Sequence, residues 1–200
     1  MPLALVFAVV AVFAFSAAPA HAQILVRPAY NCPPETLERP FAPWADDANY
    51  VLVGDGGFEG GASGWQRSRA IVVEGNQPLN KRAATDAHAL ELAPGGTAKS
   101  PEICVGLHHP SLRFFVRKTG SPLGSLAVEV VVTTVLGLRI GLPVGLLVSS
   151  GGGWAPSPPM PVLANLLALG GRTRVALRFT SLGLSTWEID DVYVDPYSKG

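Results

Sequence analysis

Hydrophobic and polar positions alternate along much of the chain, and this alternation predicts β-strands rather than helices. The predicted strands are Tyr50–Val53, Trp65–Glu74, His88–Leu92, Ala98–Val105, Ser111–Lys118, Ser125–Thr134, Leu138–Val148, Met160–Leu167, Arg172–Thr180 and Thr186–Val194. Turn clusters separate them, such as Gly54–Gly64, Thr119–Pro122, Ser149–Pro159 and Ser181–Ser185. Many short strands at this spacing predict an all-β fold, an antiparallel β-sandwich of jelly-roll type. The best helical alternative is Met160–Leu169, but its short and uniformly apolar run favours a strand.

The same alternation assigns the strand side chains to two faces. In Ser111–Lys118 and Arg172–Phe179, apolar side chains at every second position are expected to point into the core. These side chains are Leu112, Phe114, Val116, Val175, Leu177 and Phe179. Because strands of a sandwich bury one face only, the arginines between them should share a polar face with Glu129 and Glu188.

The first residues predict export from the cytoplasm. The apolar run Leu3–Phe15 is followed by small residues at Ala20 and Ala22, a pattern typical of a secretory signal peptide. A retained anchor is the alternative, because no Lys or Arg precedes the run. The run is shorter than the about 20 residues that a spanning helix needs. We therefore expect a signal peptide over residues 1–22, an extended arm over 23–49 and a sandwich domain over 50–197, in a secreted or cell-envelope protein.

The predicted arm is rich in proline and has little periodicity, so it needs fixed points on the domain. Phe41 and Trp44 are the expected apolar anchors, and Cys32 is expected to form a disulfide with Cys104. Because the disulfide would close a long loop, the chain-entropy account gives it about 4 kcal/mol of stabilisation of the folded state. Two buried free thiols are the alternative.

Charge and motifs exclude several classes of function. The chain has 15 basic and 15 acidic residues, so no net charge favours nucleic acid or an anionic membrane. The most apolar later segment, Leu123–Val148, is interrupted by Glu129, Arg139 and Pro143, so no further membrane span is expected. Nucleophile-elbow and zinc-protease motifs are absent, and no facing pair of acids is evident. An enzyme is therefore not expected.

The polar face and one tryptophan are the candidate ligand site. Arginine makes planar, bidentate contacts with carboxylates, and an exposed aromatic ring can stack on a sugar. The candidate ligand-binding residues are Arg113, Phe115, Arg117, Trp154, Arg174 and Arg178. Two alternatives stay open: a solvated face with cross-strand ion pairs, and a Trp154 that belongs to the core.

A second candidate site is a metal centre. Glu59 lies in the glycine-rich segment Gly54–Gly64, and Asp190 and Asp191 are adjacent in the last predicted strand. Calcium prefers several carboxylate and carbonyl oxygens, so these three acids could be ligands of a structural Ca²⁺. Alternatively, Glu59 caps a turn and the two aspartates pair with strand arginines or with solvent.

These same segments carry a resemblance. The motif Gly57-Phe58-Glu59 with Gly64-Trp65, and the closing Ile189-Asp190-Asp191-Val192, resemble the two ends of carbohydrate-binding modules with the galactose-binding-like jelly roll. Asp86–Leu92 and Trp154-Ala155-Pro156 are similar to middle segments of those modules. The resemblance implies a structural calcium at Glu59 and at Asp190 or Asp191. With Phe41-Ala42-Pro43-Trp44, the chain also resembles a group of uncharacterised secreted bacterial proteins.

Together these observations predict a secreted, non-catalytic binding module for a glycan or another cell-envelope ligand. The alternative is a structural or protein-interaction domain of the cell surface that has no small ligand. A polar face with exposed aromatics beside unpaired arginines in a concavity would favour the first function. A flat face with every arginine paired would favour the second.

Overall fold

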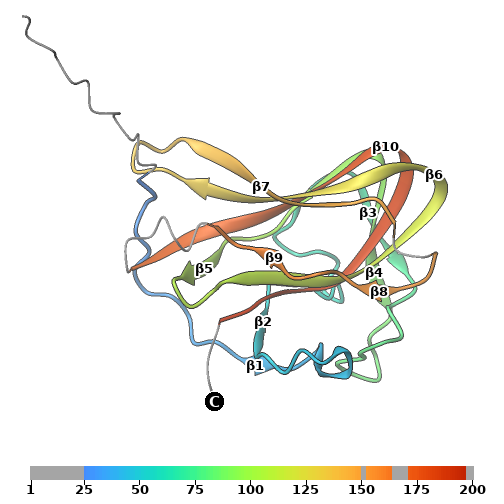
Figure 1. The fold of residues 1–200 in the computed structure, drawn as a ribbon, viewed down its shortest axis with the longest axis horizontal. Coiled ribbons are helices and arrows are strands. Elements are labelled where there is room, and N and C mark those ends of the chain that lie inside the picture. The colour runs from blue at the N-terminus through green and yellow to red at the C-terminus, as the bar shows by residue number, and fades with distance from the viewer. Residues whose placement is uncertain (1–24, 150–151, 164–170, 197–200) are drawn as a thin grey trace, which may run out of the picture.

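Alternating inward and outward side chains produce an antiparallel, all-β structure, as the sequence predicts. The computed structural model describes residues 25–149, 152–163 and 171–196 (Figure 1). Its strands are β1 (Leu37–Glu38), β2 (Tyr50–Leu52), β3 (Gln66–Glu74), β4 (His88–Lys99), β5 (Ile103–Gly106), β6 (Ser111–Thr133), β7 (Arg139–Leu147), β8 (Ala155–Pro156), β9 (Met160–Pro161) and β10 (Arg172–Val194). A short 3-10 helix, η1 (Ala42–Trp44), precedes β2. The predicted signal peptide and the end of the predicted strand Met160–Leu167 lie outside the described residues.

Two long strands, β6 and β10, organise the fold. They pair with each other from Val175 opposite Val132 to Val194 opposite Leu112, and both bend sharply at the same level (Figure 1). The bend lies where Gly183, with a φ of 81°, is opposite Gly124, with a φ of 156°. A Cβ added at Gly183 would lie 2.9 Å from the Gly124 Cα, so this close approach requires glycine.

The sequence predicts turns at Thr119–Pro122 and Ser181–Ser185 that separate strands, but in the structure β6 and β10 each run through these segments as one bent strand. The two bends lie side by side, and β6 and β10 stay paired on both sides of them, with a register shift between Gly183 and Ser185. In the same way β4 continues through Gly95 (φ 73°) and joins the predicted strand His88–Leu92 to the first residues of the predicted strand Ala98–Val105, whose last residues belong to β5. Glycine therefore folds the sheet over on itself without ending its strands.

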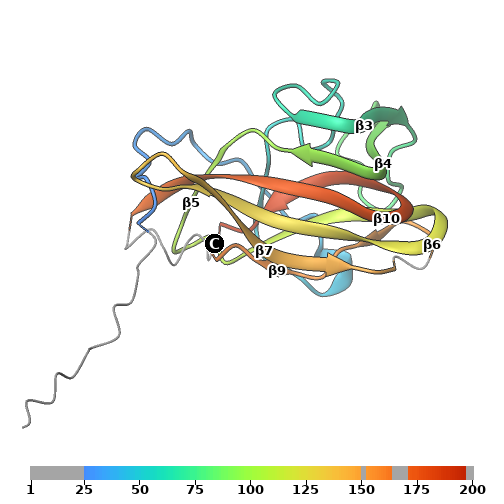
Figure 2. The same ribbon diagram turned by 90° about the horizontal axis from the view of Figure 1, so that it is seen from above.

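Folding over divides the sheet into two layers. Sheet I consists of β7, the second half of β6 (125–133), the first half of β10 (172–182), β5, and the parts of β4 and β3 near residues 97–99 and 66–68. Sheet II consists of the first half of β6 (111–118), the second half of β10 (186–194), β2, β8, β9 and the remaining parts of β4 and β3. In sheet I, β7, β6 and β10 lie side by side (Figure 2).

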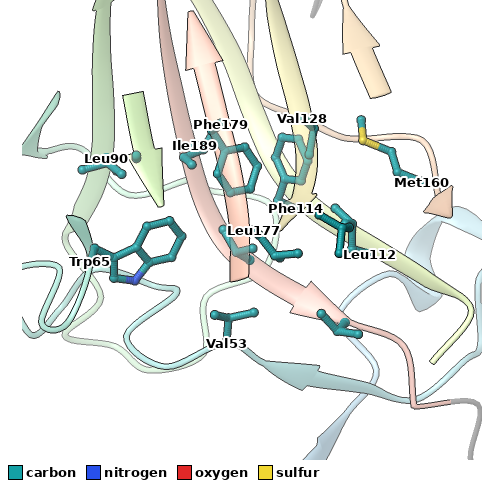
Figure 3. Packing of buried hydrophobic residues seen from close by; sticks show 14 of the residues in the cluster. Val53, Trp65, Leu90, Leu112, Phe114, Val128, Met160, Leu177, Phe179 and Ile189 are labelled. Carbon is teal, nitrogen blue, oxygen red and sulfur yellow. The ribbon is translucent and has the colours of Figure 1, made fainter. Parts of the chain in front are cut away.

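The core lies between the two layers (Figure 3). Phe114 from sheet II meets Phe179 from sheet I, with ring centroids 5.0 Å apart and nearly perpendicular planes. Trp65 and Trp187 are buried in the same core, where the Trp65 Nε1–H donates to the Gly54 carbonyl at 3.0 Å. Burial of each such side chain contributes about 1.5–3 kcal/mol or more, so the alternating inward residues account for the layered fold.

The N-terminal arm wraps around the domain, as the sequence predicts. Residues Val26 and Pro28 form bridges to Thr134 and Thr173 at one end of sheet I. Cys32 and Cys104 then form the predicted disulfide, with 5.9 Å between their Cα atoms.

Beyond the disulfide, the arm crosses to the outer face of sheet II. There Phe41 is fully buried against Tyr50, Phe115 and Tyr193, whereas Trp44 stays partly exposed. The prediction of Phe41 as an anchor is confirmed. The arm thus packs on the outer face of sheet II and reaches sheet I only at one end.

Candidate functional site

The predicted ligand residues lie on two opposite faces of the sandwich. Because Phe114 and Phe179 point toward each other through the core, their outward-pointing neighbours point in opposite directions. Arg113, Phe115, Arg117 and Trp154 belong to the outer side of sheet II, and Arg174 and Arg178 belong to the outer side of sheet I. The prediction of one shared polar face was therefore wrong, because it did not anticipate the bend in β6 and β10.

Arg113 and Phe115 hold the arm in place. Phe115 has no exposed surface and lies beneath Phe41, with 5.2 Å between the ring centroids. The Arg113 Nη1 is 2.5 Å from the Asp46 Oδ2, and its guanidinium lies 4.2 Å from the centroid of the Phe41 ring. Burial raises the pKa of Asp46, but hydrogen bonds from Tyr50 and Arg113 outweigh it and hold that pKa below its usual range. Neither predicted ligand residue is open to a ligand, which corrects their assignment.

Arg117 and Trp154 form a partly exposed pair at the margin of this arm contact. The Arg117 Nη2 is 2.6 Å from the Glu188 Oε2, so Arg117 already has a carboxylate partner. Its guanidinium also lies 5.1 Å from the centroid of the Trp154 ring. Trp154 packs against the aromatic cluster around Phe41 and is half-buried, so one face of its ring is occupied.

On sheet I, Arg178 and Arg174 differ in their partners. The Arg178 Nε donates to the Glu129 Oε2 at 2.6 Å. This hydrogen bond lowers the pKa of Glu129 and raises the pKa of Arg178, as expected for a stable ion pair. Arg174, four residues earlier in the same strand, is exposed and has no ion-pair partner among the described residues.

Arg174 borders a hollowed surface that we call the basic trough. It consists of two adjoining hollows of about 240 and 220 Å³, which share Glu102 and Thr133. Small side chains, Val131 and Ala176, lie beneath it. The charged residues that line the trough are Arg27, Lys99, Glu102, Arg139 and Arg174.

One exposed aromatic residue lies at the end of the trough. Tyr30 has 78% of its surface exposed and lines the same hollow as Arg27 and Arg174. The sequence analysis missed it because the arm has no periodicity there. Its place two residues before Cys32 was the available signal, since the disulfide fixes the arm at that point.

A third hollow, about 450 Å³, lies between the arm and the domain and adjoins the trough at Arg174 and Glu102. Ion pairs occupy many of its charged groups. Glu35 contacts the buried His109 at 3.2 Å and Arg172 at 3.1 Å, and burial lowers the pKa of His109. These contacts attach the arm to the domain, so this hollow is a structural junction.

The predicted calcium ligands come together only in part. The Glu59 Oε1 accepts the backbone N–H groups of Ala87 and His88, and its Oε2 lies 2.8 Å from the His88 Nδ1. Glu59 therefore caps a turn, the alternative that the sequence left open. Burial raises the pKa of Glu59, but the hydrogen bonds from His88 outweigh it and lower that pKa. Within residues 25–149, 152–163 and 171–196, no three His, Cys, Asp or Glu side chains gather as a metal site.

Asp190 and Asp191 are buried carboxylates without a paired cation in hydrogen-bond contact in the described structure. Gln77 donates to both, through its backbone N–H to Asp190 and its side-chain amide to Asp191. Burial and the adjacent Asp191 carboxylate raise the pKa of Asp190 to about 8, and burial raises that of Asp191 to about 7. These two acids fit the oxygen chemistry of calcium, whereas the carboxylate of Glu59 is engaged by His88.

In the described ranges, no helix has the length and apolar character needed to cross a membrane. No protein-family model matches the chain, and no curated protein matches it.

Solved structures match the fold. The CBM22-1-GH10 modules of the Clostridium thermocellum endo-1,4-beta-D-xylanase 10B, complexed with xylohexaose, match at a TM-score of 0.51 and 14% identity, over 72% of this chain and 28% of that chain. TmCBM61 in complex with beta-1,4-galactotriose matches at 0.40 and 16% identity, over 72% and 96% of the two chains. The CBM22-1-CBM22-2 tandem domain of Paenibacillus barcinonensis Xyn10C matches at 0.47 and 13% identity, over 74% and 45%. At such low identity the likeness shows the fold alone, which is the β-sandwich of carbohydrate-binding modules, as the sequence motifs predict.

Proposed function

We propose that this chain is an exported, non-catalytic module that binds a glycan in the basic trough. The observation that carries the proposal is the exposed Tyr30 in a single hollow with Arg27 and Arg174, which have no ion-pair partner among the described residues. An exposed ring can stack on the apolar face of a sugar, and planar guanidinium groups bind oxygen ligands in a bidentate manner. The carbohydrate-binding-module fold supports the same function.

The lining of the trough supports binding rather than catalysis. Glycoside hydrolysis usually requires two carboxyl groups on either side of the scissile bond. Of the described residues that line the trough, Glu102 is the one acid. The disulfide supports export, because such bonds form and persist in oxidising compartments.

A structural or protein-interaction module of the cell surface is the second candidate. The outer face of sheet II favours it, because Arg113 and Arg117 are both paired with carboxylates there. In that case sheet II would carry the function, and the basic trough would be a solvated surface.

The test is a polysaccharide and glycan-array screen of the protein, followed by measurements on variants. We expect saturable binding that Tyr30→Ala and Arg174→Ala each weaken about tenfold or more, a loss of about 1.4 kcal/mol. Trp154→Ala, on sheet II, is the matched aromatic control and should bind normally. Loss of binding in Trp154→Ala alone would move the site to sheet II. Absence of binding to every glycan, by a cooperatively folded protein, would refute the function.

We also propose that Asp190 and Asp191 hold a structural calcium ion. A cation would offset the repulsion of two buried carboxylates. It would also supply a positive charge, which the neutral Gln77 does not have. Calcium should raise the Tm, and a chelator should reverse the rise. Asp191→Asn should abolish this response, whereas Asp47→Asn, at an exposed position, should keep it. An unchanged Tm with calcium and with chelator would exclude the ion.

A further inference from the structure

The basic trough carries an excess of positive charge that the chain as a whole does not have. Its lining contains four cationic side chains and one acidic side chain, Glu102. The whole chain has 15 of each sign. The neighbouring pair of Arg178 and Glu129 is neutral and does not change this excess.

Two arginines of the trough have no carboxylate partner in the described structure, unlike three other strand arginines. Arg113, Arg117 and Arg178 each lie within 2.6 Å of a carboxylate oxygen. Arg139 and Arg174 are exposed, and neither has an ion-pair partner among the described residues. Their guanidinium groups therefore remain available to an anionic ligand without breaking an existing pair.

The positions of these cations suit a chain with several charges. Arg139 on β7 pairs with Thr133 on β6, and the Arg27 N–H donates to the carbonyl of Thr133 on the other side. The same arm segment bridges to Thr173, the neighbour of Arg174. Because β6 lies between β7 and β10 and Val132 is opposite Val175, Arg139 and Arg174 are two strand spacings apart, about 10 Å at the backbone. At that separation they would bind different groups of one polymer.

Aromatic stacking alone is a weak basis for binding here. Among the described residues that line the trough, Tyr30 is the one aromatic, and it lies at one end. The surface beneath the middle is formed by small side chains, Val131, Thr133 and Ala176. A neutral sugar chain would find one ring to stack on, whereas an anionic chain would find four cations.

We infer that the ligand of the basic trough is an anionic polysaccharide, whose carboxylate or sulfate groups bind Arg27, Lys99, Arg139 and Arg174. This inference rests on the proposed glycan-binding function and names the chemical class of its ligand. Each contact would be a charge-assisted hydrogen bond, so binding should weaken as salt rises.

The experiment compares polygalacturonate, which carries carboxylates, and dextran sulfate with neutral xylan and galactan, at 50 and 500 mM NaCl. We expect binding to at least one anionic polymer, with a loss of tenfold or more at the higher salt. Arg139→Gln combined with Arg174→Gln should weaken this binding at least tenfold. Lys81→Gln removes one exposed positive charge outside the trough and should bind normally. Thermal melts verify that each variant is folded.

The outcomes separate the inference from the function on which it rests. Preference for polygalacturonate or for dextran sulfate would support the inference and identify the anionic group. Salt-independent binding to neutral xylan or galactan would overturn the anionic ligand and leave the glycan-binding function standing. Equal binding to single-stranded poly(dT) would also overturn the inference, because the trough would then select charge without selecting sugar. Absence of binding to every polymer would overturn both.

Discussion

Some arginines attach segments to each other through ion pairs, whereas others face solvent without a carboxylate partner in the part of the chain that the structure describes. Arg113 belongs to the first group, because it connects Asp46 of the arm to β6 and covers the ring of Phe41. Arg174 belongs to the second group and borders the basic trough. Removing a buried partner leaves an uncompensated charge, so the first group affects stability and the second affects binding.

Acid should release the arm through Asp46. Its pKa is lower in the folded protein than the 3.8 of the free group, so its contribution is complete above that value and is lost as the pH falls through the folded pKa. The protection of the backbone amides of residues 39–49 against hydrogen exchange, relative to the intrinsic rate at each pH, should therefore decrease below about pH 4. In Asp46→Asn the same amides should already be less protected at pH 7, and their protection should no longer decrease near pH 4. Asp47→Asn should behave like the wild type. An unchanged acid response in Asp46→Asn would contradict this role.

At the scale of elements, the arm contacts both sheets, and the bent strands determine which face each residue of β6 and β10 occupies. The arm covers the outer face of sheet II through Phe41, whereas its earlier residues supply Arg27 and Tyr30 to one end of sheet I. The bends in β6 and β10 place the first and second halves of each strand in different layers. The arm thus covers the outer face of sheet II and supplies two residues of the basic trough at sheet I.

Phe41→Ala should destabilise the protein by about 3–5 kcal/mol, the range for a fully buried aromatic side chain. Phe41 has no exposed surface and contacts three aromatic rings. Trp44→Ala, at a neighbouring position that is 37% exposed, should cost clearly less. Urea unfolding measures both. Equal losses in the two variants would mean that Phe41 is not the principal anchor.

Gly183→Ala tests the bend of β10. The substitution combines a positive φ with a close approach to Gly124, so we expect a loss of about 1–3 kcal/mol in the free energy of unfolding. Gly153→Ala is the matched control, because no atom lies within 4 Å of the added Cβ. If the two variants unfold at the same urea concentration, the bend does not depend on glycine.

At the scale of the whole molecule, the disulfide joins the arm to sheet I beside the basic trough. Cys32 and Cys104 are 72 residues apart, and closing such a loop contributes about 4 kcal/mol in the chain-entropy account. Cys32→Ser with Cys104→Ser should therefore lose about this free energy of unfolding and should also weaken glycan binding, because Tyr30 and Arg27 would no longer be fixed. A variant with lower stability but unchanged affinity would show that the arm does not contribute to the site.

Local alternation was enough to predict which side chains point inward. Leu112, Phe114 and Val116 are buried as predicted, because a period of two along one strand is a local property. The bends could not be predicted, because glycine and proline clusters are typical of turns, and the pairing of β6 with β10 on both sides of the bend is a contact between distant parts of the sequence.

The basic trough was beyond prediction for a related reason. Arg27, Lys99, Arg139 and Arg174 come from four segments far apart in the sequence, and no local pattern connects them. Arg174 was predicted from its strand, but its separation from Arg117 depends on the folding over of the sheet. The outcome for the predicted metal ligand Glu59 also depended on a distant contact, since His88 engages its carboxylate.

The most direct test of the account is an NMR titration of the protein with an oligogalacturonate. The account predicts that the largest backbone shift changes occur at residues 27–30, 131–133, 139–141 and 174–176, along the outer face of sheet I. These changes should saturate and should diminish at high salt. Changes confined to the neighbourhood of Arg117 and Trp154, or no changes at all, would contradict it.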